Sequence, residues 1–331
     1  MCKTRSSSDV LAKAVQVDTG SRLHFGFYST TGGPGLFASM GMAIDEPSFR
    51  AEVSPLDGDI AVSGPEADRL ARLAREVVDA LGVPGAEIRA TSIIPAHVGL
   101  GSTTQMKLGM AMALNELYGL GKTVRELAFE LGRGEFSGIG TLAFELGGFI
   151  VDTGRRPGHI SGPGDLPRAL LRLDVPERWR FILLVREGAR GLDEREERTL
   201  LLGLEPMPER KASRICYLLM RHLVPALIWD DAVSFGRALT EIQELVGDYF
   251  SPYQGGIFMD EAAEELRAFL LAEGAYGVGQ SSWGPTLYAL TVDERASALK
   301  RSVEDFLTRK GLRYHVLIVR PRNVGARIEL V

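Results

Sequence analysis

Cysteine, long apolar runs and blocks of like charge are all scarce in this sequence of 331 residues. The two cysteines, Cys2 and Cys216, lie far apart, which indicates neither a disulfide framework nor a cysteine metal site and favours a reducing, cytoplasmic compartment. No run of 18 apolar residues occurs, and residues 1–9 lack the apolar centre of a signal peptide. We therefore expect neither a membrane span nor a secretory leader.

The charge balance argues against a nucleic-acid-binding protein. A formal net charge of −5 without a lysine- or arginine-rich run argues against nucleic acid as the main partner, although a local cationic pocket for a phosphate remains compatible with it. Three common signatures are also missing: the lysine and spacing of a P-loop, the GxGxxG that follows a strand in dinucleotide-binding folds, and a paired-carboxylate motif. The chemistry must lie in other patterns.

Hydrophobic residues make up 45% of the chain, enough for a substantial core in two lobes or one large domain. We expect a disordered tail at residues 1–12, a first lobe over residues 13–160 and a second lobe over residues 168–331, because the stretch 154–167 is rich in glycine and proline. Strands and helices are mixed in both lobes, which predicts an α+β fold.

Local patterns predict the individual elements. Apolar periodicity from Pro65 to Gly82, a methionine stripe from Met106 to Leu117 and a capping box at Thr123 each predict a helix. The arginine and glutamate cluster 190–198 is interpreted as a solvated or mobile segment. Strands are expected at 14–18, 49–54, 87–94, 149–152, 181–185, 286–291 and 314–319, and further helices at 212–246, 262–272 and 294–310.

The most informative segment is the glycine and hydroxyl loop at residues 95–105, which lies between a β-branched run and the methionine-striped helix. Glycines let the backbone approach an anion, and the first amides of the following helix favour negative charge. His97 either faces a ligand or caps the loop, and the hydroxyls of 102–104 either bind phosphate oxygens or a magnesium water or serve only as helix caps. The loop is a candidate phosphate cradle.

Two other segments carry residues suited to ligand binding. Residues 19–26 place Arg22, a clamp for phosphate or carboxylate, next to His24, a proton donor or acceptor near neutral pH; the alternative is a surface ion pair and a satisfied histidine. Residues 274–285 combine glycines, serines, Gln280 and Trp283, so the indole either stacks on a flat ligand or fills the interface between the lobes.

Five segments, in this order, cover nearly the whole chain: TGSRLHFG, PAHVGLGSTTQ, GRGEFSGIGTLAFELGGFIVD, YQGG and GVGQSSWGPT. Together they resemble the β-ribofuranosylaminobenzene 5′-phosphate synthase family, an offshoot of the GHMP kinases. The PxxxGLGS core is typical of the superfamily, whereas GVGQSSWGPT is much more specific to the synthases.

The resemblance implies a two-lobe GHMP-kinase-like fold, with an N-terminal lobe like ribosomal protein S5 domain 2, a ferredoxin-like C-terminal lobe, and the site between them. It also implies a reaction that joins phosphoribosyl pyrophosphate to an aromatic carboxylate such as 4-aminobenzoate and releases carbon dioxide and pyrophosphate, as in methanopterin biosynthesis. Close relatives use a pyrazole carboxylate to build C-nucleoside antibiotics. The family implies Mg²⁺ and often forms dimers.

Two positions bear on the choice between kinase and synthase. The superfamily kinases carry Ser-Gly-Val-Asp before a Gly-Gly pair, whereas this chain has Ser137-Gly138-Ile139-Gly140, so a glycine stands where the kinase aspartate would be. Thr103 replaces a glycine expected in the synthase loop. Besides a synthase, an ATP-dependent small-molecule kinase and a binding protein that has lost its activity remain alternatives.

From these arguments we expect Arg22, His24 and His97 to be catalytic, Asp152 to join Ser102 and Thr103 as tentative metal ligands, and Glu145 to be a secondary candidate. The expected substrate-binding residues are Gly99, Gly101, Ser102, Thr103, Thr104, Gln105, Arg133, Ser137, Gln280, Ser281, Ser282 and Trp283.

Overall fold

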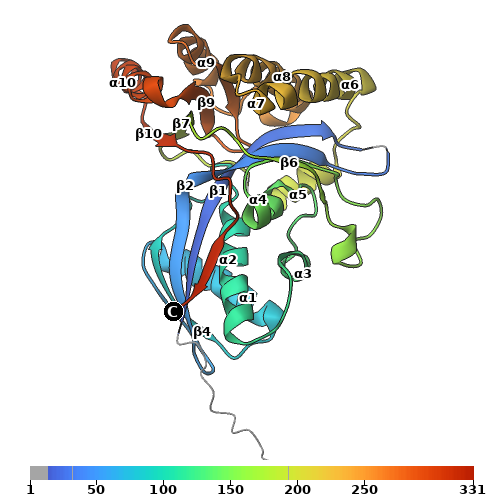
Figure 1. The fold of residues 1–331 in the computed structure, drawn as a ribbon, viewed down its shortest axis with the longest axis vertical. Helices are drawn as coiled ribbons and strands as arrows, with labels where there is room; N and C mark the ends of the chain where they lie inside the picture. Colours follow the sequence, from blue (N-terminus) through green and yellow to red (C-terminus); the bar gives the residue numbers. More distant parts are fainter. Residues whose placement is uncertain (1–13, 32, 193) are drawn as a thin grey trace, which may run out of the picture.

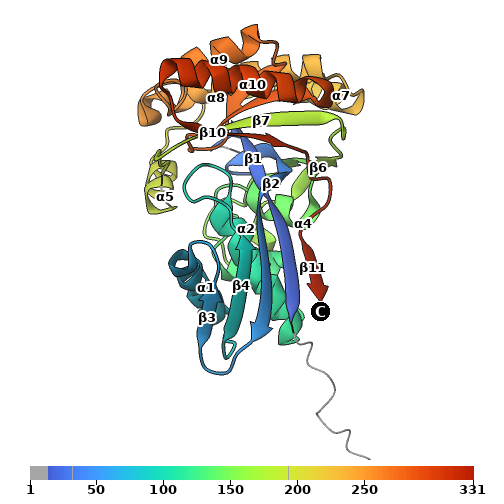
Figure 2. The same cartoon turned by 90° about the vertical axis from the view of Figure 1, so that its left-hand side faces the viewer.

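The computed structural model describes residues 14–31, 33–192 and 194–331, and the tail expected at residues 1–12 lies outside this part. Two sheets and the helices that cover them form the two lobes, one above the other in Figures 1 and 2. Strands and helices are mixed in both lobes, which confirms the α+β class. No helix of the described part has both the length and the apolar character needed to span a membrane.

The larger sheet has seven strands and is built around a long hairpin of β1 and β2. The strand order is β11-β1-β2-β4-β3. Strand β5 pairs with the N-terminal part of β2, and β6 pairs with β5. The strands are β1 (Val15–Ser29), β2 (Ala38–Pro55), β3 (Ile60–Ser63), β4 (Ala86–Ser92), β5 (Phe149–Asp152), β6 (Ala169–Leu173) and β11 (Arg327–Leu330).

Strand β1 is longer than the sequence predicts. The segment 19–26, expected to follow the first strand, lies inside β1, because register shifts at Thr19/Ser21 and His24/Gly26 let the strand continue through its two glycines. Side chains alternate across a strand, so Arg22 and His24 share one face while Leu23 and Phe25 enter the core. This alternation positions the candidate site residues.

Four helices complete the first lobe: α1 (Ala67–Leu81), α2 (Ser102–Leu117), α3 (Val124–Glu130) and α4 (Ile139–Leu146). The predicted stop of α1 at Gly82, which adopts a φ of 64°, and the capping box at Thr123 are both present. The methionines Met106 and Met110 are fully buried in the core, as the stripe predicts.

The smaller sheet has the order β10-β7-β9-β8 and is antiparallel throughout. On β7, Ile182 and Leu184 pack against α9 and α10, whereas Phe181 and Leu183 face the core shared with β1. One face of this sheet is therefore covered by helices and the other joins the lobes. The elements are β7 (Trp179–Arg186), β8 (Gly277–Gln280), β9 (Leu287–Val292), β10 (Tyr314–Val319), α6 (Glu209–Leu218), α7 (Val224–Ile228), α8 (Ala232–Gln254), α9 (Ala263–Ala272) and α10 (Asp293–Lys310), with short turns η1 (Pro163–Asp165) and η2 (Leu219–Leu223).

The sheets do not follow the chain division expected near residues 160–168. Both β6 and β11 come from the expected second lobe, yet they complete the larger sheet, β6 beside β5 and β11 beside β1. The reason is that β1 and β5 have hydrogen-bonding edges that only a later segment can occupy. The chain thus returns to the first lobe at its C-terminal strand, as Figure 2 shows.

The polar cluster at residues 190–198 also differs from the prediction. Its second half begins α5 (Glu194–Leu202), a largely polar helix whose Leu201 is 2% exposed. Spacings of three and four residues place several of its charged side chains on one helical face. That face lines the cleft described below, while residues 194–196 and 198 are exposed as expected of a solvated segment, which here forms a helix.

Candidate functional site

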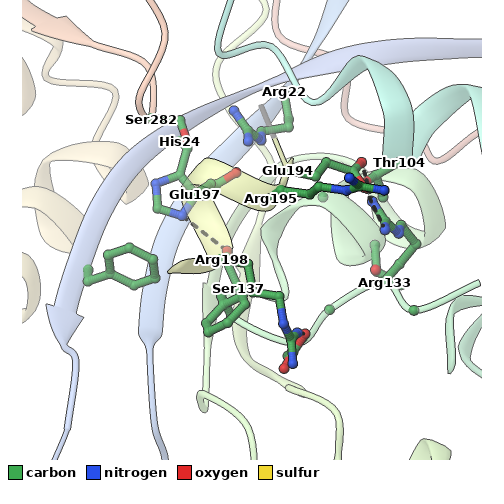
Figure 3. A pocket seen from close by; sticks show the side chains of 17 residues that line it. Arg22, His24, Thr104, Arg133, Ser137, Glu194, Arg195, Glu197, Arg198 and Ser282 are labelled. Atoms are coloured by element: carbon green, nitrogen blue, oxygen red, sulfur yellow. Dashed lines mark hydrogen bonds and ion pairs between the residues drawn. The ribbon is translucent and has the colours of Figure 1, made fainter. Parts of the chain in front are cut away.

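A cleft between the lobes holds two adjoining cavities. The central cavity has a volume of about 410 Å³, and its wall includes Arg22, His24, Ser137, Gly140, Arg133 and Glu197 (Figure 3). The loop cavity, of about 140 Å³, lies against the 95–105 loop and includes His97, Gly99, Gly101, Ser102, Thr103 and Trp283. Arg22, Thr104, Arg133, Glu194, Glu197 and Ser282 line both. The structure thus brings most predicted site residues together.

The glycine loop takes a conformation suited to anion binding. Gly99 and Gly101 have φ values of 81° and 78°, a backbone region that favours glycine. A Cβ on Gly99 would lie 2.1 Å from the carbonyl oxygen of Ser281, so the loop needs a glycine there to pack against the 280–285 segment. Helix α2 starts at Ser102, so its first amides and the side chains of Thr103 and Thr104 lie beside the cavities.

Arg22 lies beside this loop. Its Nη1 donates to the carbonyl oxygen of Gly99 over 2.5 Å and its Nε is buried without a hydrogen-bond partner among the described residues. Burial lowers the pKa of Arg22 to about 10, although the nearby Glu197 carboxylate opposes this. At neutral pH Arg22 is therefore a charged, incompletely satisfied donor in the cleft, which suits an anionic ligand.

His24 has both ring nitrogens engaged. Its Nδ1 accepts from the backbone N–H of Gly26 over 3.1 Å, so in the neutral ring the proton is on Nε2, which lies 3.0 Å from Ser137 Oγ. Burial, and secondarily the charge of Arg22, lower the pKa of His24 well below its usual value. The predicted catalytic role of His24 thus stays a prediction, and the geometry favours an uncharged ring held in a set orientation.

A chain of hydrogen bonds runs from His24 into the protein. Ser137 Oγ lies 2.8 Å from Ser39 Oγ, which donates to Asp152 Oδ2 over 2.5 Å. Asp152 also accepts from the backbone N–H groups of Ser39, Gly138 and Gly154. Burial raises the pKa of Asp152 to about 6, although these hydrogen bonds oppose the rise.

Asp152 was expected as a tentative metal ligand, and the structure places it elsewhere. The carboxylate is 0% exposed, it lines neither cavity, and its two oxygens already receive four donors. The secondary candidate Glu145 is exposed on α4, outside both cavities. Among the described residues no group of three or more histidine, cysteine or acidic side chains is arranged to hold a metal.

Several predicted substrate-binding residues instead join segments of the fold. Gln105 accepts from Thr19 Oγ1 over 2.7 Å and donates to the carbonyl oxygen of Gly140 over 2.7 Å, which fixes α2 between β1 and α4. Ser281 donates to the carbonyl oxygen of Gly99 over 2.6 Å and accepts from the backbone N–H of His24. Their amide and hydroxyl groups are used inside the protein, because the loops they connect contain buried backbone groups that need partners.

The rest of the 280–285 segment borders the cleft. Ser282 lines both cavities and adopts a φ of 56°, while Gln280 accepts from the backbone N–H of Met259 over 2.7 Å. Trp283 is 6% exposed and meets the ring of Phe250 edge-on at 4.3 Å between centroids. Trp283 lines the loop cavity and fills the interface between the lobes, as one of the two interpretations predicts, whereas stacking of the indole on a flat ligand stays a prediction.

Helix α5 supplies functional candidates that sequence reasoning missed. Glu194, Arg195, Glu197 and Arg198 line the central cavity, and Arg133 pairs with Glu194 through both guanidinium nitrogens at 2.6 and 3.1 Å. Burial raises the pKa of Glu197, opposed by the charge of Arg22. The spacing of charges in α5 was a visible signal, but only the tertiary structure shows which side faces the cleft.

Gly140 lies at the start of α4 and lines the central cavity. A Cβ at this position would lie 3.2 Å from Thr104 Cγ2, so the space for a longer side chain is restricted by the first turn of α2. The carboxylate of the kinase pattern is absent from this wall.

Comparison with known proteins decides the family. The models for the GHMP kinases N terminal domain and GHMP kinases C terminal match residues 68–148 and 223–308. A β-ribofuranosylphenol 5′-phosphate synthase of Archaeoglobus fulgidus is 33% identical over 96% of this chain and 100% of its own length. The chain belongs to this synthase family. Its members are pentosyl-transferring enzymes, and the synthase of Methanothermobacter thermautotrophicus is 30% identical over 94% of the chain and 97% of its own.

This chain is also similar to homoserine kinases. A homoserine kinase of Methanopyrus kandleri is 27% identical over 84% of this synthase-family chain and 89% of its own length. The solved homoserine kinase of Cytophaga hutchinsonii has 17% identity and a TM-score of 0.67, covering 99% of this chain and 100% of its own. This structural likeness, together with the two family models, confirms the expected two-lobe GHMP-kinase-like fold.

Proposed function

We propose that the protein transfers a 5-phosphoribosyl group from phosphoribosyl pyrophosphate to the carboxylate-bearing carbon of an aromatic acid such as 4-aminobenzoate, in a methanopterin-type pathway. The bond between C1 of the ribose and the pyrophosphate oxygen breaks, and a bond from C1 to the ring carbon forms. The ring carbon then loses its carboxylate as carbon dioxide, and the electron pair of that bond restores aromaticity. Carbon dioxide and pyrophosphate are the by-products.

The observation that carries this proposal is the pairing of an anion cradle with a carboxylate-free position at Gly140. The loop and the start of α2 would bind the pyrophosphate, and the guanidinium of Arg22 would stabilise the charge that develops on the leaving oxygens. The transfer needs no general base on an alcohol. An uncharged His24 ring would also suit the reaction, because it would place no further positive charge beside the oxocarbenium-like C1 of the ribose.

The cleft also contains oxygen groups that fit Mg²⁺. Glu197 and Thr103 line the loop cavity, so oxygen groups lie beside the proposed pyrophosphate site, whereas Glu194 has both carboxylate oxygens paired with Arg133. Ser102 is a less suitable ligand because its Oγ already accepts from Arg69 over 2.9 Å. When bound, the metal would neutralise charge on the pyrophosphate.

The acceptor is the finer part of the proposal. The relatives are named for a ribofuranosylphenol product, so 4-hydroxybenzoate joins 4-aminobenzoate and a pyrazole carboxylate as an acceptor to compare. An ATP-dependent kinase is the competing function, supported by the likeness to homoserine kinases. It would have to work without the general base of the kinase pattern, at a cost of roughly 10²- to 10⁴-fold in rate.

One assay separates these functions. The protein is incubated with Mg²⁺, phosphoribosyl pyrophosphate and each acceptor in turn, and carbon dioxide and pyrophosphate are measured. Equal release of both with one acceptor supports the synthase. Release of neither, together with ATP consumption on homoserine or another alcohol, would overturn it.

A further inference from the structure

A third cavity shares part of its wall with the central one and is lined by no residue of the 95–105 loop. The Arg155 cavity has a volume of about 400 Å³, and its wall includes Arg133, Glu135, Arg155, His159 and Arg198. Arg133, Glu135 and Arg198 also line the central cavity. The loop cavity, the central cavity and the Arg155 cavity therefore form a continuous row.

Arg155 resembles Arg22 in having a buried Nε without a hydrogen-bond partner among the described residues. Its side chain follows β5, the residue is 8% exposed, and among the described residues no carboxylate forms an ion pair with it. Its Nη1 donates to the carbonyl oxygens of Arg156 and Gly158, both at 3.0 Å, while its buried Nε has no hydrogen-bond partner. A buried cation without a counterion is costly unless an anion reaches it.

The other charges of this cavity favour the same ligand class. Arg198 pairs with Glu135 and its guanidinium lies 5.8 Å from the ring centre of Phe136, so the cavity wall combines one carboxylate with Arg133, Arg155 and Arg198. Arg133 is held by Glu194 from the neighbouring cavities. Positive charge is thus in excess around the unpartnered Nε, and guanidinium groups bind phosphate well.

We infer that the Arg155 cavity binds the 5-phosphate of the phosphoribosyl donor. The inference rests on the proposed function, because that donor carries anionic groups at both ends of a ribose. The order of the cavities matches the order of its parts: pyrophosphate at the glycine loop, ribose in the central cavity, and phosphate monoester at Arg155. Arg198, on the shared wall, is the second phosphate contact.

Calorimetric titration with ribose 5-phosphate, and separately with Mg²⁺-pyrophosphate, tests this assignment. Arg155→Met keeps an aliphatic stem beside Phe37 and removes the charge, and Arg156→Met is the control, since that neighbouring side chain is 77% exposed and pairs with Asp165. We expect Arg155→Met to weaken ribose 5-phosphate binding roughly 10- to 100-fold, the loss typical of a charged hydrogen bond, and pyrophosphate binding less than twofold.

A folded Arg155→Met variant that binds ribose 5-phosphate as tightly as the original chain overturns the inference. If this variant does not fold, Arg198→Met decides by the same comparison, because its side chain is 52% exposed and less needed for packing. Failure of the proposed function gives a different result. In that case no acceptor is ribosylated, but the Arg155 and Arg198 variants still bind ribose 5-phosphate more weakly than the original chain. In a working synthase, the KM for the donor rises with the dissociation constant and the KM for the acceptor does not.

Discussion

His24 and Ser137 lie 113 residues apart in the chain and are joined by a 3.0 Å contact between Nε2 and Oγ. Because Ser137 is linked through Ser39 to the buried Asp152, the orientation of a cleft residue depends on a carboxylate that never reaches the cleft. Asp152, first considered as a metal ligand, acts in this structure as an anchor for the wall of the site.

The middle link of that chain can be removed. Ser39→Ala removes the hydroxyl that bonds both Ser137 and Asp152, while their other hydrogen bonds remain, and we expect it to lower the free energy of unfolding by about 1–3 kcal/mol in urea denaturation. Ser48→Ala is the control, because Ser48 is equally buried on β2 but its hydroxyl contact to Ser92 measures 3.4 Å. Equal losses for the two variants would contradict the role of Ser39.

The glycine loop can be tested against a glycine of similar backbone. Gly99→Ala and Gly121→Ala both place a Cβ at positive φ, of 81° and 66°, but only Gly99 has a backbone atom within 3 Å of that Cβ. We expect Gly99→Ala to lower kcat/KM at least tenfold by displacing the 280–285 segment, while Gly121→Ala changes only the melting temperature. Unchanged kinetics in Gly99→Ala would show that the loop tolerates this displacement.

Placing the aspartate of the kinase pattern at position 140 is not expected to give the protein kinase activity. Gly140→Asp crowds Thr104, whose Cγ2 lies 3.2 Å from the new Cβ, so we expect ribosyl transfer to fall and no ATP-dependent phosphorylation of homoserine to appear. Gly140→Ala separates the effect of bulk from that of charge. A gain of phosphoryl transfer in the aspartate variant alone would support the competing kinase function.

Trp283 borders the loop cavity and also lines a small apolar cavity with Phe27 and Phe250, and it packs edge-on against Phe250. Trp283→Phe keeps an aromatic ring in the lobe interface, so we expect the fold to persist and the KM for the aromatic acceptor to rise about 2- to 10-fold, with a smaller change for the donor. Trp229→Phe, at a residue that is 82% exposed, provides the matched control. Steady-state kinetics with each substrate varied in turn distinguishes the two effects, and a larger change for the donor would place the indole on the phosphate side.

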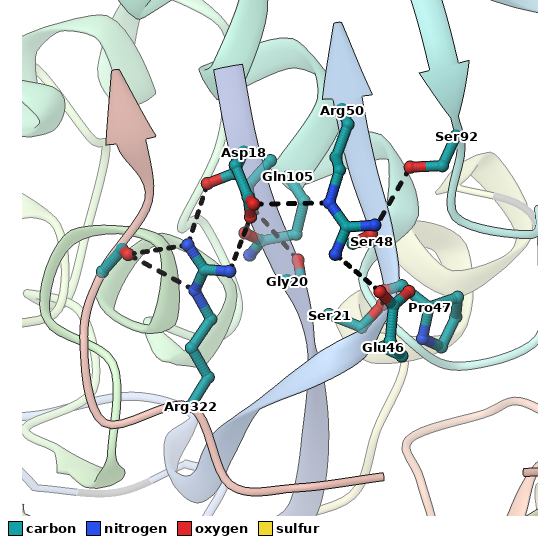
Figure 4. Close-up of polar contacts among 12 residues, drawn as sticks. Asp18, Gly20, Ser21, Glu46, Pro47, Ser48, Arg50, Ser92, Gln105 and Arg322 are labelled. Atoms are coloured by element: carbon teal, nitrogen blue, oxygen red, sulfur yellow. Dashed lines mark hydrogen bonds and ion pairs between the residues drawn. The ribbon is translucent and has the colours of Figure 1, made fainter. Parts of the chain in front are cut away.

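Asp18 connects the C-terminal segment to the hairpin, accepting from Arg322 over 2.7 Å and from Arg50 over 3.3 Å (Figure 4). Partial burial opposes its ionisation, but the two arginines outweigh this and lower the pKa of Asp18. A lowered pKa in the folded state means that the stabilisation is present above the unfolded value, near 3.9, and is lost as the pH falls through the folded value.

Asp18→Asn should therefore destabilise the protein at pH 7, and its difference from the original chain should shrink as the pH falls below about 4. Urea denaturation at a series of pH values measures this difference. A difference that stays constant down to pH 3 would mean that the Asp18 carboxylate contributes packing or hydrogen bonding rather than charge.

Local sequence patterns were sufficient to predict the helices whose ends are marked by capping residues. The capping box at Thr123, the stop at Gly82 and the buried methionines of α2 follow from spacing alone, since caps and helical faces are formed by residues within a few positions of one another. The same holds for the glycine loop before α2, and the motifs and their order along the chain were enough to indicate the family that the comparisons confirm.

Only the tertiary structure decided which polar side chains face the cleft. Asp152 and Gln105 have the chemistry of ligand contacts, but Asp152 accepts from buried backbone N–H groups and Gln105 bonds Thr19 and the carbonyl oxygen of Gly140. The charged face of α5 is brought to the site by packing of Leu201. Sequence spacing specifies faces within one element, whereas the partner of a buried polar group often comes from another element, such as Ser39 for Asp152, 113 residues away. For that reason the sequence by itself determined the fold class, the family and the glycine loop, and the packing of the lobes determined which residues line the cleft.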